Sequence, residues 1–175
     1  MQDDRQLGFR DERPEALEKY LQEIQSNRHP LSLLAAGVDD VRNIGALFRL
    51  ADAARLDKLY FLDWPAHLNE KKLKRVSRST VRYVPYERLD LQGVQQLATE
   101  RPLVGLEITD QSVPYTAFKP ENGMVLVVGH EAHGIPPEVL SLCTACIHLP
   151  MYGVNTSMNV AMAAGIAVYG VLGRM

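Results

Sequence analysis

Residues 31–62 read LSLLAAGVDDVRNIGALFRLADAARLDKLYFL, and the order of apolar segments in this stretch indicates the fold class. Two short apolar runs, Leu31–Ala36 and Lys58–Leu62, predict strands. Residues 43–56 between them predict a helix, because apolar side chains recur there on one helical face: Ile44, Leu47, Phe48, Ala51 and Ala54. Strand, helix and strand in this order form the unit of a parallel sheet.

The same alternation continues outward from this unit in both directions. Apolar spacing predicts a helix over Pro14–Ser26, and the later elements are a helix Leu68–Arg78, an extended segment Arg82–Pro85, a helix Leu91–Glu100, strands Leu103–Ile108 and Met124–Gly129, a short helix near Pro136, a strand Ala145–Leu149 and a helix from Ser157 to Leu172. We therefore expect an α/β fold with a parallel sheet flanked by helices. We divide the chain into an N-terminal charged segment and helix, residues 1–30, and a single domain, residues 31–175.

The composition is that of an ordinary soluble domain, with 175 residues of which 46% are hydrophobic and 23% charged. The first residues, MQDDRQLGFRDERPE, are charged where a signal peptide would be apolar, and two cysteines cannot staple a secreted scaffold. The apolar stretch Met158–Leu172 is too short to span a bilayer. We therefore expect a cytoplasmic protein with no membrane segment. A net charge of −2 still leaves room for a local basic site.

Ligands of open parallel sheets bind beyond the carboxyl ends of the strands, so the loops there carry the chemistry. The first such loop, residues 37–49, reads GVDDVRNIGALFR. Asn43 lies at the expected helix start, where its side chain can cap a backbone amide, and Gly45 allows another backbone to come close. Arg49 follows six residues later. A cap and a surface arginine without further function are the alternative interpretation.

The second loop, within residues 125–135, reads VLVVGHEAHGI and runs from a strand into G-x-E-x-x-G. It differs from the dinucleotide-binding G-x-G-x-x-G because Glu131 replaces the middle glycine, and a carboxylate there would repel a phosphate. The loop therefore favours a cationic ligand or one rich in hydrogen-bond donors. An ordinary glycine-bearing turn is the alternative.

The third loop lies within residues 148–170, HLPMYGVNTSMNVAMAAGIAVYG, and leads into a helix that Ser157 and Asn159 open. The helix is rich in small residues, which permit close packing: Ala161, Ala163, Ala164, Gly165 and Ala167. An N-cap serine on a buried helix is the simpler interpretation.

Cys143 and Cys146 form a C-x-x-C near three histidines, His130, His133 and His148, so a zinc site can be assembled on paper. The chain has no second cysteine pair and the histidines lack the H-E-x-x-H spacing. We therefore favour buried cysteines over a metal or redox site and expect no metal.

Six cations fall within residues 71–82 with no acid among them: Lys71, Lys72, Lys74, Arg75, Arg78 and Arg82. On a helix followed by a turn they could grip the phosphates of a nucleic acid. A solvated helix face is the usual explanation of such a run.

Taken together, in this order and spacing, the three loops resemble the three motifs of the SpoU (TrmH) branch of the SPOUT RNA methyltransferases. Asn43 with Arg49 resembles the first motif, Gly129–Gly134 the second, and Leu149–Met151 with Ser157–Val160 the third. The resemblance implies a single-domain SPOUT-type fold with a C-terminal deep trefoil knot, an exception to unknotted topology. It also implies a homodimer that methylates a ribose 2′-hydroxyl of tRNA or rRNA with S-adenosylmethionine.

The resemblance also implies roles for particular residues. The cofactor would be bound, largely through backbone atoms, by Leu106, Glu107, Gly129, Leu149, Met151, Ser157 and Met158. The catalytic group would be Asn43, Arg49, Glu131, Ser157 and Asn159. An arginine is protonated at any working pH, so we expect Arg49 to clamp a phosphate rather than act as the base.

The chain departs from the family pattern at two positions. Arg55 stands where a glycine is usual near the end of the first motif's helix, and Met158 stands where a leucine is usual. The first change alters a helix end and the second nearly conserves volume. A non-catalytic RNA-binding protein with the same fold is the main alternative, and a nicotinamide- or flavin-dependent oxidoreductase is a distant third.

Overall fold

A computed structural model describes residues 14–155 and 157–175. Its centre is one sheet whose seven strands follow the order β3-β2-β1-β6-β4-β7-β5, with every neighbouring pair parallel. The strands are β1 (Ser32–Ala36), β2 (Leu59–Leu62), β3 (Tyr86–Leu89), β4 (Leu103–Leu106), β5 (Val113–Pro114), β6 (Val125–Val128) and β7 (Ala145–His148). The α/β class and the parallel sheet are therefore confirmed.

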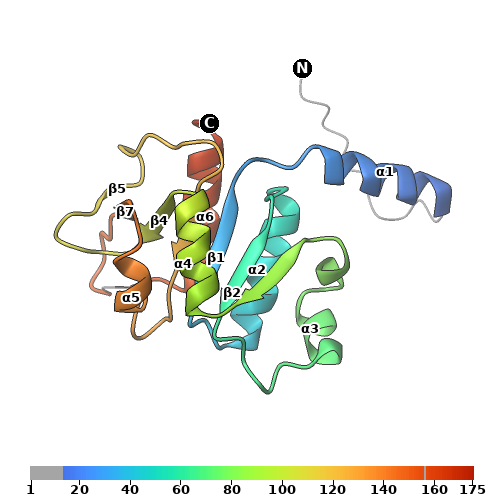
Figure 1. Ribbon diagram of the computed structural model, residues 1–175, viewed down its shortest axis with the longest axis horizontal. Coiled ribbons are helices and arrows are strands. Elements are labelled where there is room, and N and C mark those ends of the chain that lie inside the picture. Colours follow the sequence, from blue (N-terminus) through green and yellow to red (C-terminus); the bar gives the residue numbers. More distant parts are fainter. Residues whose placement is uncertain (1–13, 156) are drawn as a thin grey trace.

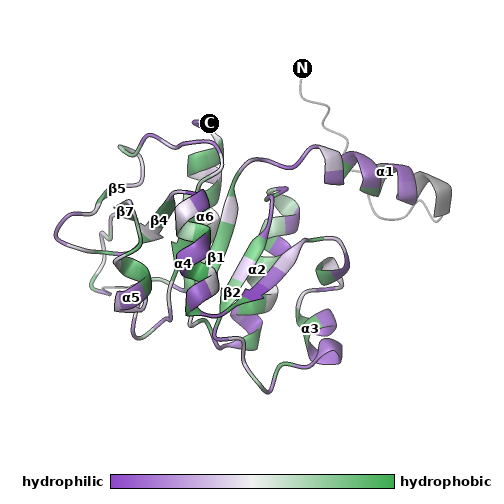
Figure 2. Ribbon diagram, in the orientation of Figure 1, coloured by the Kyte–Doolittle hydropathy of each residue, from purple (hydrophilic) through white to green (hydrophobic). Residues whose placement is uncertain are grey.

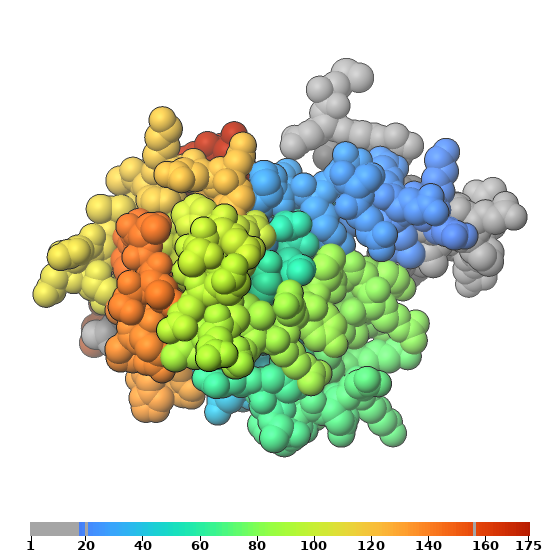
Figure 3. Space-filling model, viewed as in Figure 1, coloured from blue at the N-terminus to red at the C-terminus, as the bar shows by residue number. Residues whose placement is uncertain are grey.

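Helices cover both faces of this sheet (Figure 1). They are α1 (Pro14–Ser26), α2 (Val41–Ala53), α3 (Glu70–Val76), α4 (Leu91–Glu100), α5 (Pro137–Leu140) and α6 (Val160–Leu172), with a 3₁₀ turn η1 (Thr80–Arg82). The buried side chains of α2, α3 and α6 share one core with the sheet, and those of α4 and α5 share the other. In Figure 3, α4 in yellow-green covers the middle of the visible face, beside α5 in orange.

Strand β1 shows why the sequence forms three layers. All five of its residues are buried. Leu33 and Ala35 point into the core under α2 and α6, whereas Leu34 and Ala36 point into the core under α4. Side chains alternate between faces along a strand, so a continuous apolar run suits a strand that is covered on both sides. Figure 2 shows this apolar character in green on the central strands, in contrast to the purple of α3.

The prediction of an extended segment at Arg82–Pro85 is wrong. Its first residue closes the 3₁₀ turn η1, and the strand β3 begins after Pro85 at Tyr86. Strand β3 lies at the edge of the sheet and its residues are exposed or half-buried, so it has no apolar run to mark it. The short edge strand β5 escaped the sequence pattern for the same reason.

Two helix starts also differ from expectation. Helix α2 is capped by Asp40, whose side chain accepts from the amide of Arg42, so Asn43 lies inside the first turn. The Arg42 side chain also donates to Asp40 and holds the pKa of that carboxyl below its ordinary value. Helix α6 is capped by Asn159, and Ser157 lies in the loop before it. Capping by these residues leaves Asn43 and Ser157 outside the caps and available to the site.

The backbone conformation of Arg55 explains why a glycine is usual at this position in the family. Arg55 follows α2 with a φ of 46°, in the left-handed region that glycine adopts without strain. We expect Arg55→Gly to raise the free energy of unfolding by about 1 kcal/mol, measured by urea denaturation. Arg55→Ala, which keeps a β-carbon, is the control and should not show this gain. A lower unfolding midpoint for Arg55→Gly would show that the side chain matters more than the backbone strain.

Helix α1 lies to one side of the sheet and forms an arm at the edge of the molecule (Figures 1 and 3). Leu21 and Ile24 on it are half-buried. Among the helices of the described residues, none combines the length and the apolar character that a membrane crossing requires.

Candidate active site

A cavity of about 470 Å³ opens at the carboxyl ends of β4, β6 and β7. Its walls are the segments that follow these strands, together with the start of α6. All the residues expected to hold a cofactor line it: Leu106, Glu107, Gly129, Leu149, Met151, Ser157 and Met158. A volume of this size suits a small-molecule ligand.

The loop Gly129–Gly134 forms one wall and is held in a tight hairpin. The amide of His130 donates to the carbonyl of Gly134 over 2.9 Å, and the reverse bond is 2.8 Å. Gly134 has a φ of 69°, and the Glu107 carboxylate lies where a β-carbon on it would stand. That carboxylate also accepts from the amides of Ile108 and Ile135, both over 3.1 Å. Glu107 therefore ties two walls of the cavity together.

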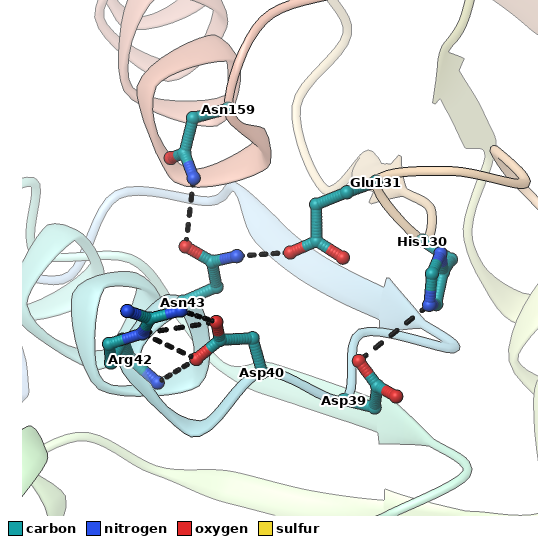
Figure 4. A network of polar contacts seen from close by, with 7 residues as sticks. All are labelled: Asp39, Asp40, Arg42, Asn43, His130, Glu131 and Asn159. Carbon is teal, nitrogen blue, oxygen red and sulfur yellow. Dashed lines mark hydrogen bonds and ion pairs between the residues drawn. The ribbon is translucent and has the colours of Figure 1, made fainter.

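Three of the expected catalytic residues are joined by hydrogen bonds (Figure 4), and one of them, Glu131, lines the cavity. The Asn43 amide nitrogen donates to a carboxylate oxygen of Glu131. The Asn43 amide oxygen accepts from the Asn159 amide nitrogen over 3.0 Å. Asn159 also caps α6, since its own amide oxygen accepts from the backbone of Ala161 and Met162. These hydrogen bonds join α2, the second loop and the start of α6 in one polar cluster. We call it the rim cluster, and its members are Asn43, Glu131 and Asn159.

The other two expected catalytic residues, Arg49 and Ser157, take no part in the hydrogen bonds of the rim cluster that the structure describes. Ser157 lines the cavity, as Glu131 does. Arg49 is exposed on α2, and its guanidinium donates to the carbonyl of Val76 at the end of α3 over 2.8 Å. Within this chain, therefore, the arginine is directed toward α3 rather than toward the rim cluster.

Some cavity residues were missed by the sequence reasoning. Ile108 and Thr109 follow β4 and His148 ends β7, so the rule about carboxyl ends of strands could have found them. The Nδ1 atom of His148 lies 2.9 Å from the hydroxyl oxygen of Ser112. His130 also lines the cavity, and it pairs with Asp39, with 3.6 Å between Nε2 and Oδ1.

The basic segment, residues 71–82, lies on α3 and η1. Five of its cations are exposed and Lys72 is half-buried. None of the six forms a salt bridge with an acid in the described part of the chain. Exposed cations that have no acidic partner among the described residues fit an anionic partner better than an internal structural role.

The two cysteines are free thiols. Burial raises the pKa of the Cys143 thiol to about 12, so it stays protonated at neutral pH and is a poor metal ligand.

A different group, Asp39, His130 and Glu131, brings candidate ligand atoms within 4.8 Å of one another. The Nδ1 of His130 already accepts from the amide of Ala132, which favours a proton on the Nε2 that faces Asp39. This pairing opposes metal binding by His130.

The fold and the cavity define an α/β protein with a small-molecule site beside a polar cluster and a basic surface. The family model described as the SpoU rRNA Methylase family matches residues 30–169. The chain is 30% identical over 159 residues to the tRNA (guanosine(18)-2′-O)-methyltransferase of Aquifex aeolicus, a match that covers 86% of this chain and 73% of that enzyme. The chain therefore belongs to the SpoU rRNA methylase family, as the motifs indicate.

Two further comparisons support the assignment. The chain is 32% identical over 142 residues to the 23S rRNA (guanosine(2553)-2′-O)-methyltransferase RlmP of Bacillus subtilis, which covers 81% of this chain and 57% of that enzyme. The crystal structure of the A. aeolicus TrmH/SpoU tRNA modifying enzyme superposes with a TM-score of 0.78 at 26% identity, over 91% of this chain and 84% of that one. The chain thus spans little more than half the length of the B. subtilis enzyme.

Proposed function

We propose that this chain transfers the methyl group of S-adenosylmethionine to a ribose 2′-hydroxyl of tRNA or rRNA. The observation that carries the proposal is the rim cluster, in which three of the expected catalytic residues join through Glu131 to the cavity that the expected cofactor residues line. The relatives from A. aeolicus and B. subtilis, whose names describe guanosine 2′-O-methyltransferases of tRNA and 23S rRNA, agree with it.

The residues of the cavity fit S-adenosylmethionine. Among the described residues that line it, none is a lysine or an arginine, and two are the carboxylates Glu107 and Glu131. Such a lining accommodates a sulfonium cation and disfavours a phosphate-bearing cofactor. Apolar walls from Leu106, Leu149 and Met151 suit the adenine ring. S-adenosylmethionine, when bound, supplies an electrophilic methyl group, and no metal is needed for this chemistry.

The chain's own residues then have to position a ribose and remove one proton. The Asn43 amide holds the Glu131 carboxylate, so the rim cluster presents fixed polar groups to a nucleotide at the mouth. The guanidinium of Arg49 clamps a phosphate beside the target ribose. The hydroxyl of Ser157, or that phosphate, relays the proton from the 2′-hydroxyl to solvent water while the 2′-oxygen takes up the methyl group.

The test uses the full chain, S-adenosylmethionine with a labelled methyl group, and tRNA and rRNA that lack modifications. Transfer of label, recovered as a 2′-O-methylnucleoside after digestion, is the expected result. Binding of RNA without any transfer would support the alternative, a non-catalytic RNA-binding protein. Mapping 2′-O-methyl positions in total RNA from cells with and without the gene then identifies the nucleotide.

The basic segment is the proposed RNA-docking surface. Replacing Lys72, Arg75 and Arg78 together with alanine should weaken RNA binding and lower the slope of log K against log salt by about 2 to 3, since each phosphate contact contributes about 0.9. Filter binding at several salt concentrations measures this slope. The matched control replaces Arg88, which lies over the Trp64 ring, with alanine. An unchanged affinity of the triple variant at low salt would remove the segment from the interface.

A homodimer is part of the proposal. Met162, Ile166 and Tyr169 recur on one face of α6 with 61%, 41% and 55% of their surfaces exposed. An apolar face of this kind suits a two-fold interface. Light scattering of the purified chain tests the mass, and Ile166→Glu should yield monomers.

We also propose the remaining family features for this chain. These are the C-terminal trefoil knot, the division at residue 30 and a cytoplasmic location, where tRNA and rRNA occur. The position of α1 beside the sheet supports the division. Tracing the chain in a crystal structure with S-adenosylmethionine tests the knot.

A further inference from the structure

Helices α2 and α3 come unusually close at Gly45. A β-carbon on Gly45 would lie 2.6 Å from both the carbonyl carbon and the carbonyl oxygen of Val76. Real β-carbons do not approach backbone atoms so closely, so no other residue fits without moving the end of α3. The backbone approach that the sequence led us to expect at Gly45 is thus an approach to the last residue of the basic helix.

Arg49, one turn further along α2, uses the same carbonyl. Its Nη1 atom donates to the Val76 oxygen over 2.8 Å. A carbonyl at the end of a helix has no partner within the helix and carries partial negative charge, so a guanidinium binds it well. Gly45 and Arg49 therefore act on one atom: the glycine admits the carbonyl and the arginine binds it.

The chain beyond Val76 couples this carbonyl to the basic side chains. Ser77 is fully buried. Arg78 and Ser79 follow with φ values of 50° and 70°, a backbone conformation that residues other than glycine rarely adopt. The amide of Ser79 returns to the carbonyl of Lys74 over 2.9 Å. Arg75 near the end of α3 and Arg78 on the hydrogen-bonded turn after it thus lie on either side of the Val76 carbonyl, within three residues of it in the sequence.

We propose that Gly45 is a positioning residue, and that RNA held by the basic segment sets the direction of Arg49 through the Val76 carbonyl. This inference rests on the proposed function, because it assigns the basic segment to RNA and Arg49 to the target phosphate. It adds that docking and catalysis are coupled through one backbone atom. If the basic segment only bound RNA and were not coupled to Arg49, changes in α3 would not alter the direction of the Arg49 side chain.

The test is a cycle of four proteins: the natural chain, Gly45→Ala, Arg49→Lys, and both changes together. Gly45→Ala should lower kcat by about tenfold or more, because small displacements of a positioning group are costly. The KM for RNA and the Kd for S-adenosylmethionine should change by less than about threefold, and the loss of kcat should largely vanish in the Arg49→Lys background. Equal losses of kcat in both backgrounds, or an unchanged kcat for Gly45→Ala, would overturn the coupling.

Two further variants separate the coupling from a general packing defect. Gly173→Ala, at the end of α6, is the control, since its β-carbon would lie 3.4 Å from the carbonyl oxygen of Tyr169, an ordinary contact, and it should keep its kcat. Ser79→Pro imposes a negative φ and removes the amide that returns to Lys74, without touching α2. If Gly45→Ala fails to fold, Ser79→Pro replaces it in the cycle with the same expected result and the same contradicting ones.

A readout without catalysis keeps this inference separate from the proposed function. In the natural chain, RNA binding should shift the NMR signal of the Arg49 Nε–H group, and in Gly45→Ala this shift should be lost while RNA still binds. A shift of equal size in both proteins would contradict the coupling even if methyl transfer is observed. A natural chain that shows the shift but transfers no methyl group would contradict the proposed function alone.

Discussion

Replacing Gly129 with alanine is expected to weaken the binding of S-adenosylmethionine severely. A β-carbon on Gly129 would overlap the carbonyl group of Gly134 and the amide of Ile135. The reciprocal bonds between His130 and Gly134 would have to break, and this hairpin forms a wall of the cavity. We expect the Kd, measured by isothermal titration, to rise by at least about 100-fold, equivalent to a loss of about 3 kcal/mol.

The matched control for this prediction is Gly153→Ala. A β-carbon on Gly153 meets no atom within 4 Å, although this glycine also lies in a loop that follows one of the cavity strands. Its affinity for the cofactor should stay within about threefold of the natural chain. If Gly129→Ala bound the cofactor as tightly as Gly153→Ala, the hairpin would not be part of the cofactor site.

The parallel sheet could be predicted from sequence because its central strands β1, β2 and β6 are continuous apolar runs. Strand β1 is buried along its whole length, so every residue in it carries the signal. Strand β3 could not be found this way, since edge strands need no apolar face and Pro85 displaces the expected segment. The pattern reports burial, and it therefore fails where a strand is exposed.

The members of the site could be proposed from sequence, but their contacts could not. Asn43 looked like a helix cap, and Asp40 performs that task instead. The side-chain amide of Asn43 instead hydrogen-bonds to Glu131 and Asn159, which are 88 and 116 residues away along the chain. Local spacing carries no information about such pairs, because the order of strands in the sheet brings them together.

The direction of the Arg49 side chain also could not be predicted from sequence. The position of Arg49 in the first motif indicated a catalytic role, and nothing in residues 37–49 indicated that its side chain would bind a carbonyl of α3. The direction of a long exposed side chain depends on its tertiary neighbours, here the close approach that Gly45 permits. Motif reasoning therefore assigned the residue but not its orientation.

Asn43→Asp is expected to lower kcat by about 100-fold or more, equivalent to about 3 kcal/mol of activation free energy. The change keeps the shape of the side chain but removes the amide that donates to Glu131 and places a second carboxylate against it. Two carboxylates in contact repel, so Glu131 must turn away or one of the pair must hold a proton. Asn43 does not line the cavity, so the Kd for S-adenosylmethionine should hardly change.

The second change Glu131→Gln tests this explanation of the Asn43→Asp defect. In the double variant an amide at position 131 can donate to the new carboxylate at position 43, while Asn159 still donates to it. The double variant should therefore be at least about tenfold more active than the product of the two single defects predicts. Activity of Asn43→Asp alone should recover relative to the natural chain as the pH falls, because protonation of one carboxyl restores a donor. Strictly multiplicative defects with no such recovery would mean that Asn43 contributes to methyl transfer without acting through Glu131.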